Sequence, residues 1–215
     1  MAKVKLREKA YESFTENLMA ANIQPGQFVS QRELTELMKM PLGAIRELIP
    51  RLEADGLIET VPQRGMQIAN VDLKLVRNAF QLRIILEKAA AVHFTEAASD
   101  TQIEELAAAH ESVLERAKKK VDTRLLDEAQ RADWRLHDSI IESLDNEIIT
   151  NIYRVNSVKI RLIRLERVLL TPSVLLPAMR EHLLIIEAMR ARNTQEVVQA
   201  LENHLSSALR RVMGV

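Results

Sequence analysis

Hydrophobic residues in the first part of the chain recur at helical spacing and are separated by turn-forming segments. A first helix is predicted from an apolar stripe that consists of Leu6, Ala10, Phe14, Leu18 and Ala21. The segment 22–26, which contains Pro25 and Gly26, is expected to stop this helix. A second helix is expected after Ser30, because Glu33 completes an S-x-x-E capping box there.

A third helix and a small hairpin follow these two helices. Pro41 suits the first position of a helix, and Pro50 lies further along and is expected to kink or loosen it. Two β-prone runs at 57–61 and 66–69 enclose a short turn and predict a hairpin. This order of elements is typical of a winged helix-turn-helix, a DNA-binding fold, which we assign to residues 1–70.

The remaining residues, 71–215, lack strand signals and have helical periodicity. Six helices are predicted at about 72–98, 100–120, 124–144, 146–169, 173–192 and 194–213. Turn and capping residues separate them. The predicted fold class is therefore mainly α, with an N-terminal winged helix-turn-helix followed by an all-helical domain.

Composition supports helices and narrows the cellular setting. Hydrophobic residues make up 47% of the chain and aromatic residues only 3%, with five glycines. The absence of cysteine excludes disulfides and thiolate metal ligands and fits a reducing compartment. No apolar run approaches the ~20 residues needed to cross a bilayer, and the first residues lack the apolar core of a signal peptide. We therefore expect a cytoplasmic protein with no membrane partner.

Net charge alone gives no indication of DNA binding. The 30 basic residues balance 30 acidic ones, and residues 1–70 carry nine of each sign. Binding to double-stranded operator DNA must then depend on the placement of a few cations. Arg46 is the best candidate for reading a base, and Arg32 is a second possible contact. Arg64 and Gly65 form the tip of the wing. Any one of these could be an ordinary surface residue, but their position in one motif favours DNA contact.

Four polar residues of the second part occupy helix positions where apolar ones are expected. They are Asp133, His137, His182 and His204. Burying them without partners would be costly, and one divalent metal ion bound by all four would relieve that cost. Asp with three His suits Zn first, or Mn, Ni or Fe. Each histidine could instead be a hydrogen-bonded core residue. His93 and His110 fit no such pattern and are assigned to structure or surface.

The first part resembles the GntR family of bacterial regulators. IQPGQFVSQREL is similar to the family segment I-x-P-G-x-x-L-x-E-x-x-L, IRELIPRLEADGLI to V-R-E-A-L-x-x-L-x-x-E-G-L-V, and QRGMQIA to the wing R-R-G-x-x-V. Leu42 stands where the family usually has a DNA-contacting arginine, beside Gly43. This departure puts the operator sequence in doubt. The candidate DNA-binding residues are then Arg32, Gly43, Arg46, Arg64 and Gly65.

The second part resembles the FCD ligand-binding domain of one GntR branch. QLRIILEKAAA, DWRLHDSIIESLDN, EHLLIIEAMRARN and ALENHL are similar to its characteristic helices. The resemblance implies an antiparallel bundle in which the aspartate and three histidines hold a metal with open positions for a ligand carboxylate. It also implies that Arg83 points into the cavity, and Arg161 or Arg164 could add a second cation. Alternatively, Arg83 forms a salt bridge with Glu87 one turn on, as exposed helix pairs do.

These patterns predict a homodimeric repressor whose operator affinity changes when a small organic acid binds beside the metal. Residues 71–215 would form the metal- and effector-binding domain. One alternative is a metal-assisted hydrolase, for which Glu181 or Glu187 could act as a base. Another is a regulator whose metal is purely structural.

Overall fold

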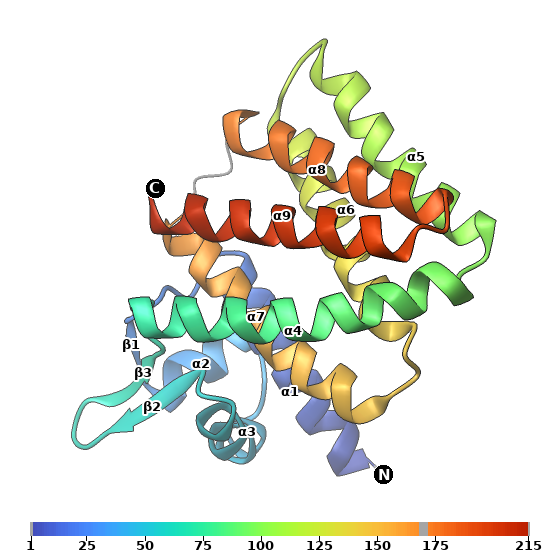
Figure 1. Ribbon diagram of the computed structural model, residues 1–215. Coiled ribbons are helices and arrows are strands. Elements are labelled where there is room, and N and C mark those ends of the chain that lie inside the picture. Colours follow the sequence, from blue (N-terminus) through green and yellow to red (C-terminus); the bar gives the residue numbers. More distant parts are fainter. Residues whose placement is uncertain (1, 168–171, 215) are drawn as a thin grey trace. The chain divides into compact units, whose positions relative to one another are not determined.

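The computed structural model describes residues 2–167 and 172–214 and divides into two compact units. One unit comprises Met1–Val76 and Ser157–Arg167, and the other comprises Arg77–Asn156 and Val168–Val215. Figure 1 labels the helices and strands of both units.

Among its described residues, the first unit contains three whole helices, a small sheet and parts of two further helices at 73–76 and 157–167. Its elements are α1 (Ala2–Met19), β1 (Phe28–Val29), α2 (Gln31–Met38), α3 (Leu42–Ala54), β2 (Ile58–Val61) and β3 (Gly65–Ile68). The capping box at the start of α2 is confirmed, because Glu33 N donates to Ser30 Oγ at 3.1 Å and Ser30 N donates to Glu33 Oε2 at 2.6 Å. The core beneath the helices includes Phe14, Leu34 and Ile45, all fully buried. This is a winged helix-turn-helix.

The sheet has one strand more than the sequence predicted. The predicted hairpin forms between β2 and β3, and β1 pairs antiparallel with the other side of β3, so the strand order is β1-β3-β2. Two residues are too short a run to give a periodic signal. Gly65 shows how closely the strands approach: its φ is +92°, and a Cβ there would lie 2.8 Å from the carbonyl oxygen of Val29.

The third helix differs from the prediction at its start. Pro41 is the residue that precedes α3, with extended backbone, and the helix begins at Leu42. Proline provides no side-chain cap, so the first turn of α3 has no side-chain hydrogen bond from this residue. Pro50 lies within α3, which continues through it to Ala54.

The second unit is built from helices. Its elements are α4 (Leu73–Ala97), whose first residues belong to the first unit, α5 (Asp100–Ala117), α6 (Thr123–Glu142), the first half of α7 (Glu147–Arg167), α8 (Pro172–Arg190) and α9 (Thr194–Met213). All six predicted helices are confirmed, with boundaries that differ by three residues or fewer wherever they can be compared. The predicted end of the fourth at residue 169 lies outside the described residues.

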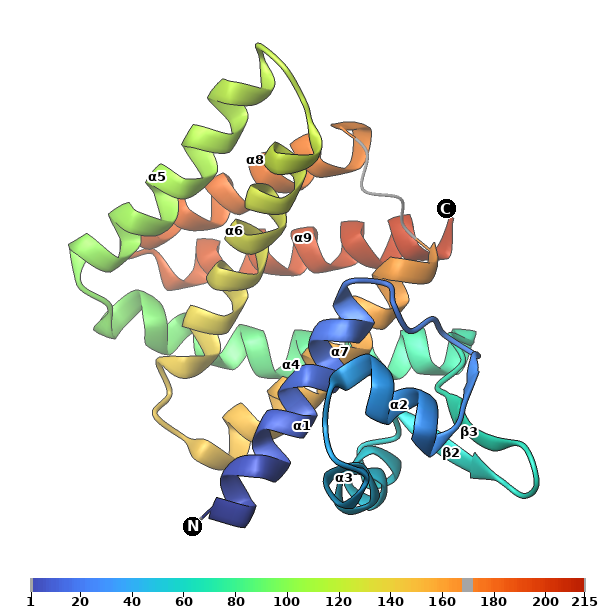
Figure 2. The ribbon, with the colours of Figure 1, turned by 180° about the vertical axis from the view of Figure 1, so that it is seen from behind.

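Apolar stripes on these helices form a large core and, beside it, a smaller cluster that includes Leu125. Ala90, Leu136, Ile186 and Leu201 are fully buried in the large core and come from four different helices. In Figure 1, α8 and α9 lie side by side and run in opposite directions, and Figure 2 shows the same relation for α5 and α6. Among the described residues, no helix is long and apolar enough to cross a membrane.

Candidate metal centre and DNA-binding surface

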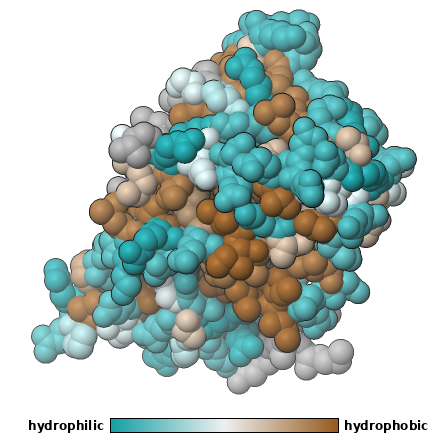
Figure 3. Space-filling view, in the orientation of Figure 1, coloured by the Kyte–Doolittle hydropathy of each residue, from teal (hydrophilic) through white to brown (hydrophobic). Residues whose placement is uncertain are grey.

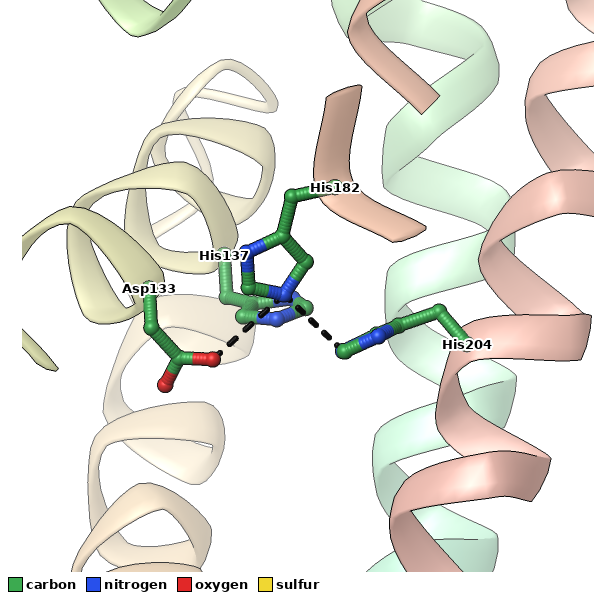
Figure 4. Close-up of side chains that lie close together, drawn as sticks. All are labelled: Asp133, His137, His182 and His204. Carbon is green, nitrogen blue, oxygen red and sulfur yellow. Dashed lines mark hydrogen bonds and ion pairs between the residues drawn. The ribbon is translucent and has the colours of Figure 1, made fainter. Parts of the chain in front are cut away.

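Four side chains from three helices meet inside the second unit. Asp133 and His137 lie one turn apart on α6, His182 projects from α8 and His204 from α9 (Figure 4). All four are buried, and one ligand atom from each lies within 4.8 Å of the others. The inward polar positions of the three helical stripes thus converge on one small space.

The tautomer of His182 follows from a chain of hydrogen bonds. His110 Nδ1 lies 2.7 Å from the carbonyl oxygen of Leu106, which can only accept, so Nδ1 of His110 carries the proton. The neutral His110 ring then presents an unprotonated Nε2, 3.1 Å from His182 Nδ1. His182 Nδ1 must donate in this contact. Nε2 of His182 is therefore unprotonated, and its lone pair points into the cluster.

The other two histidines are fixed in the same tautomer by carboxylates. His137 Nδ1 donates to Glu87 Oε2 at 2.7 Å, and His204 Nδ1 donates to Glu181 Oε2 at 2.9 Å. Glu181 also pairs with Arg211. Metal-binding histidines usually donate their outer N–H to a carboxylate or similar group, which orients the ring and raises its basicity. All three histidines thus present an Nε2 lone pair inward.

The inward-facing Nε2 atoms of the three histidines are acceptors that lie close together. His182 Nε2 lies 3.1 Å from His204 Nε2 and 3.4 Å from Asp133 Oδ1, and His137 Nε2 is buried without a hydrogen-bond partner. Protonation of a histidine in this cluster is unfavourable, because burial lowers the pKa of His182 well below 6.5 and that of His204 to about 4. A divalent cation fits this donor set of three nitrogens and one carboxylate.

Glu87 supports the cluster from α4. Its Oε1 accepts from Arg83 Nε at 2.6 Å and from the Tyr153 hydroxyl at 2.5 Å, while Oε2 accepts from His137. Burial alone would raise the pKa of Glu87, but Arg83 and His137 hold it down at about 2. The alternative role of Arg83, a salt bridge with Glu87, is present in the structure. The pair is buried and not exposed, because the Arg83 side chain is 7% and the Glu87 side chain 0% exposed.

The remaining predicted residues of the second part fall in different places. The charge of Arg83 acts on both Asp133 and His204, so its guanidinium belongs to the surroundings of the cluster. Arg161 lies half-buried on the part of α7 that belongs to the first unit. Its role toward an effector stays a prediction.

Sequence reasoning missed His110 as part of this site. It was assigned to structure or surface, and its complete burial excludes the surface alternative. The signal was present: Ile103, Leu106, Ala107, His110 and Val113 form one buried stripe of α5. His110 occupies an apolar position just as His182 does, but without a nearby Asp-x3-His spacing to draw attention to it.

The buried histidines predict how stability depends on pH. The pKa of His204 is 6.5 when unfolded and about 4 when folded, so between these values the unfolded chain binds a proton that the folded chain does not. With metal chelated, the free energy of unfolding should therefore fall as pH falls, by about 2 kcal/mol from this residue between pH 7 and 5. Urea denaturation at each pH measures it, with His204→Asn as the comparison that lacks this contribution. Greater stability at pH 5 than at pH 7 would contradict it.

The predicted DNA-contacting residues all lie on the first unit. Arg46 and Gly43 are exposed near the start of α3, and Arg46 Nε donates to Gln31 Oε1 at 3.2 Å. Within the described part of the chain, no atom lies within 4 Å of the place where a Cβ on Gly43 would be. Arg32 is exposed on α2 and pairs with Glu36.

The wing tip has a stacking contact and a glycine with a positive φ. The Arg64 guanidinium carbon lies 4.5 Å from the centre of the Phe28 ring, which orients it at the start of β3. Gly65 owes its conformation to the close approach of β1. Its predicted contact with DNA stays a prediction.

Comparison with known proteins gives a consistent result for both units. Residues 6–68 match the family model described as bacterial regulatory proteins, gntR family, and residues 78–207 match the FCD domain. The transcriptional repressor RspR of Escherichia coli is 24% identical over 204 residues, which cover 93% of this chain and 86% of that protein.

Two solved structures share the fold. E. coli McbR/YncC has a TM-score of 0.77 at 14% identity and covers 100% of this chain and 98% of its own. The Zn²⁺-bound FCD domain of the regulator TM0439 has a TM-score of 0.55 at 21% identity, covering 68% and 96%.

Proposed function

Since this chain belongs to the gntR family of bacterial regulatory proteins, in the branch with an FCD domain, we propose that it is a metal-dependent transcriptional repressor. It is a DNA-binding regulator that responds to a ligand, and its role is not enzymatic. The repressor assignment is supported by the name of its relative RspR. We assign DNA binding to residues 1–70, and metal and effector binding to residues 71–215.

One observation carries the metal proposal: four buried ligand atoms converge within 4.8 Å, and one of them, His137 Nε2, has no hydrogen-bond partner among the described residues. Asp133, His137, His182 and His204 would hold the ion, and zinc is favoured because a related FCD domain is known in a Zn²⁺-bound form. A bound cation supplies a Lewis-acidic position that attracts anionic groups. The two carboxylates considered as a catalytic base are otherwise engaged: Glu181 with His204 and Arg211, and Glu187 with Arg190.

The effector is proposed to be a small organic acid. A carboxylate would be attracted both by the metal ion and by the Arg83 guanidinium, whose charge already acts on Asp133 and His204. Arg83 is held by Glu87 through Nε alone among the contacts described. The guanidinium has two further nitrogens that can donate hydrogen bonds.

A homodimer on an inverted repeat is the arrangement we propose on DNA. Large apolar side chains remain exposed on the second unit, among them Ile85 on α4 at 59% and Ile148 on α7 at 73%. Figure 3 shows hydrophobic residues gathered on the face that α4 crosses. Exposed apolar patches on a folded chain commonly mark protein interfaces, and two-fold dimers are the commonest assembly.

The proposed function is tested by DNA-binding titrations on zinc-loaded protein. Duplexes from upstream of its own gene are titrated at low salt, first alone and then with small mono- and dicarboxylic acids. Binding that changes several-fold with one acid is expected, since allosteric couplings are typically ~1–3 kcal/mol. Absence of any DNA binding would refute the proposal that this protein is a DNA-binding regulator. A His204→Ala variant that is less stable but, while folded, keeps its ligand response would instead indicate a purely structural metal.

We expect Arg46 to contribute to DNA affinity by contacting a base of the operator. Replacing Arg46 by Ala is expected to weaken binding by about 1–3 kcal/mol and to relax the preference for guanine at one position of each half-site. Fluorescence anisotropy on the selected operator and on its single-base variants measures both effects. Arg124→Ala, which removes an exposed arginine of α6, is the matched control and should bind like the unchanged protein. Equal weakening on every sequence would assign Arg46 to phosphate.

A further inference from the structure

The first residue of the recognition helix is a large apolar side chain that faces outward. Leu42 begins α3 and is 40% exposed. The buried stripe of this helix consists of Ala44, Ile45, Leu48 and Leu52. Leu42 is therefore no part of the core that holds α3 in place. Single exposed leucines are common on protein surfaces, so the position of this one must carry the argument.

Leu42 stands one turn before Arg46, and residues four apart lie on the same face of a helix. Arg46 Nε is bound to Gln31, and Arg46 has no ion-pair partner within residues 2–167 and 172–214. Its remaining guanidinium donors are thus next to an apolar surface. Among the described residues, none lies within 4 Å of the place where a Cβ on Gly43 would be, so a DNA edge can approach the backbone of this turn closely.

The major groove presents only one apolar group, the C5 methyl of thymine. A leucine gains nothing from phosphates or from polar base edges, because it can neither donate nor accept a hydrogen bond. Against a thymine methyl, the same side chain loses exposed apolar surface, which is favourable. Arginine, by contrast, is suited to the O6 and N7 of guanine.

We propose that Leu42 is a specificity residue that reads the methyl group of a thymine close to the guanine read by Arg46. The inference rests on the proposed function, because it requires that α3 enters the major groove. It assigns to this turn a mixed readout in which one side chain selects by hydrogen bonds and its neighbour selects by apolar contact.

The test replaces single thymines by uracil, which removes the methyl and leaves the base pair unchanged. Operator duplexes are first selected from a random pool with the full zinc-loaded protein. Each thymine of the selected half-site is then replaced by deoxyuridine, and the Kd is measured by anisotropy. At one position, the loss of the methyl should weaken binding roughly fourfold per half-site, the value of one buried methyl group.

The variant Leu42→Ala identifies the side chain responsible. It should bind the unchanged operator more weakly and lose the response to deoxyuridine at that position. Leu37→Ala is the matched control, since Leu37 is an exposed leucine of α2 at 36% and should respond like the unchanged protein. Indifference to deoxyuridine at every thymine, or an undiminished response in Leu42→Ala, would overturn the inference while leaving DNA binding intact. Failure to select any duplex would overturn the proposed function and the inference with it.

Discussion

Replacing His182 by Ala should abolish the stabilisation that zinc gives to this protein. His182 Nε2 faces both His204 Nε2 and Asp133 Oδ1, so its removal takes away the ligand at the middle of the cluster. At free zinc ~1,000 times above Kd, binding to the folded state alone stabilises by about 4 kcal/mol. For a chain of this size, that is about 8–16 °C in Tm. Thermal unfolding with zinc and with chelator measures the difference.

The informative quantity is the difference between the Tm with zinc and the Tm with chelator. His182→Ala also leaves a cavity, which lowers the Tm in both conditions. Asp133→Asn is a second variant that keeps the side-chain volume and should lose most of the same increment. His93→Ala provides the control, since His93 is exposed and contacts Ser143. An unchanged zinc increment in His182→Ala, or none in the unsubstituted protein, would show that these residues do not bind metal.

Glu87→Gln should be the most destabilising conservative change in the second unit. The carboxylate compensates the buried Arg83 guanidinium at 2.6 Å and also holds His137 and Tyr153. Removing one partner of a buried pair typically costs about 3–5 kcal/mol, because the other charge is left uncompensated. Urea denaturation with chelator present measures this loss. Zinc affinity should fall by about 10–100-fold as well, since His137 loses the group that orients it.

A more exposed ion pair between α4 and α9 provides the comparison that separates the effect of burying a charge from the effect of removing one. Lys88 of α4 pairs with Glu202 at 2.7 Å, but the two side chains are 33% and 44% exposed. Glu202→Gln should therefore change the free energy of unfolding by less than about 1 kcal/mol. Replacing both Arg83 and Glu87 by Met should recover part of the loss in Glu87→Gln. Equal effects of Glu87→Gln and Glu202→Gln would contradict the role given to the buried pair.

The sequence predicted the helices well because their signals are local. The stripes and capping residues that define a helix, such as Ser30 with Glu33, lie within a few positions of one another. The strand β1 was missed because its two residues form a strand only through pairing with β3, which is distant in sequence. The wing could be recognised from its turn, but the reason for Gly65 could not.

The same distinction applies to the candidate site. Asp133 and His137 could be grouped because they share a helix, and His182 and His204 because each interrupts an apolar stripe. Their meeting in one place is a property of the packed bundle. The residues that hydrogen-bond these histidines from outside the cluster depend still more on the packing of the bundle. His110 and His182 are 72 positions apart in sequence, and Glu87 and His137 are 50 apart. No local pattern encodes such contacts.

The inward-facing lone pairs have a consequence for the lifetime of the chain. In a folded chain without metal, the acceptor atoms His182 Nε2 and His204 Nε2 face each other. Partly unfolded conformations are therefore more populated than in the metal-bound chain. Proteolysis of a folded protein commonly follows the population of such conformations. On the proposed assignment, metal supply therefore sets how long each repressor molecule survives, and metal starvation would lower repressor abundance through turnover.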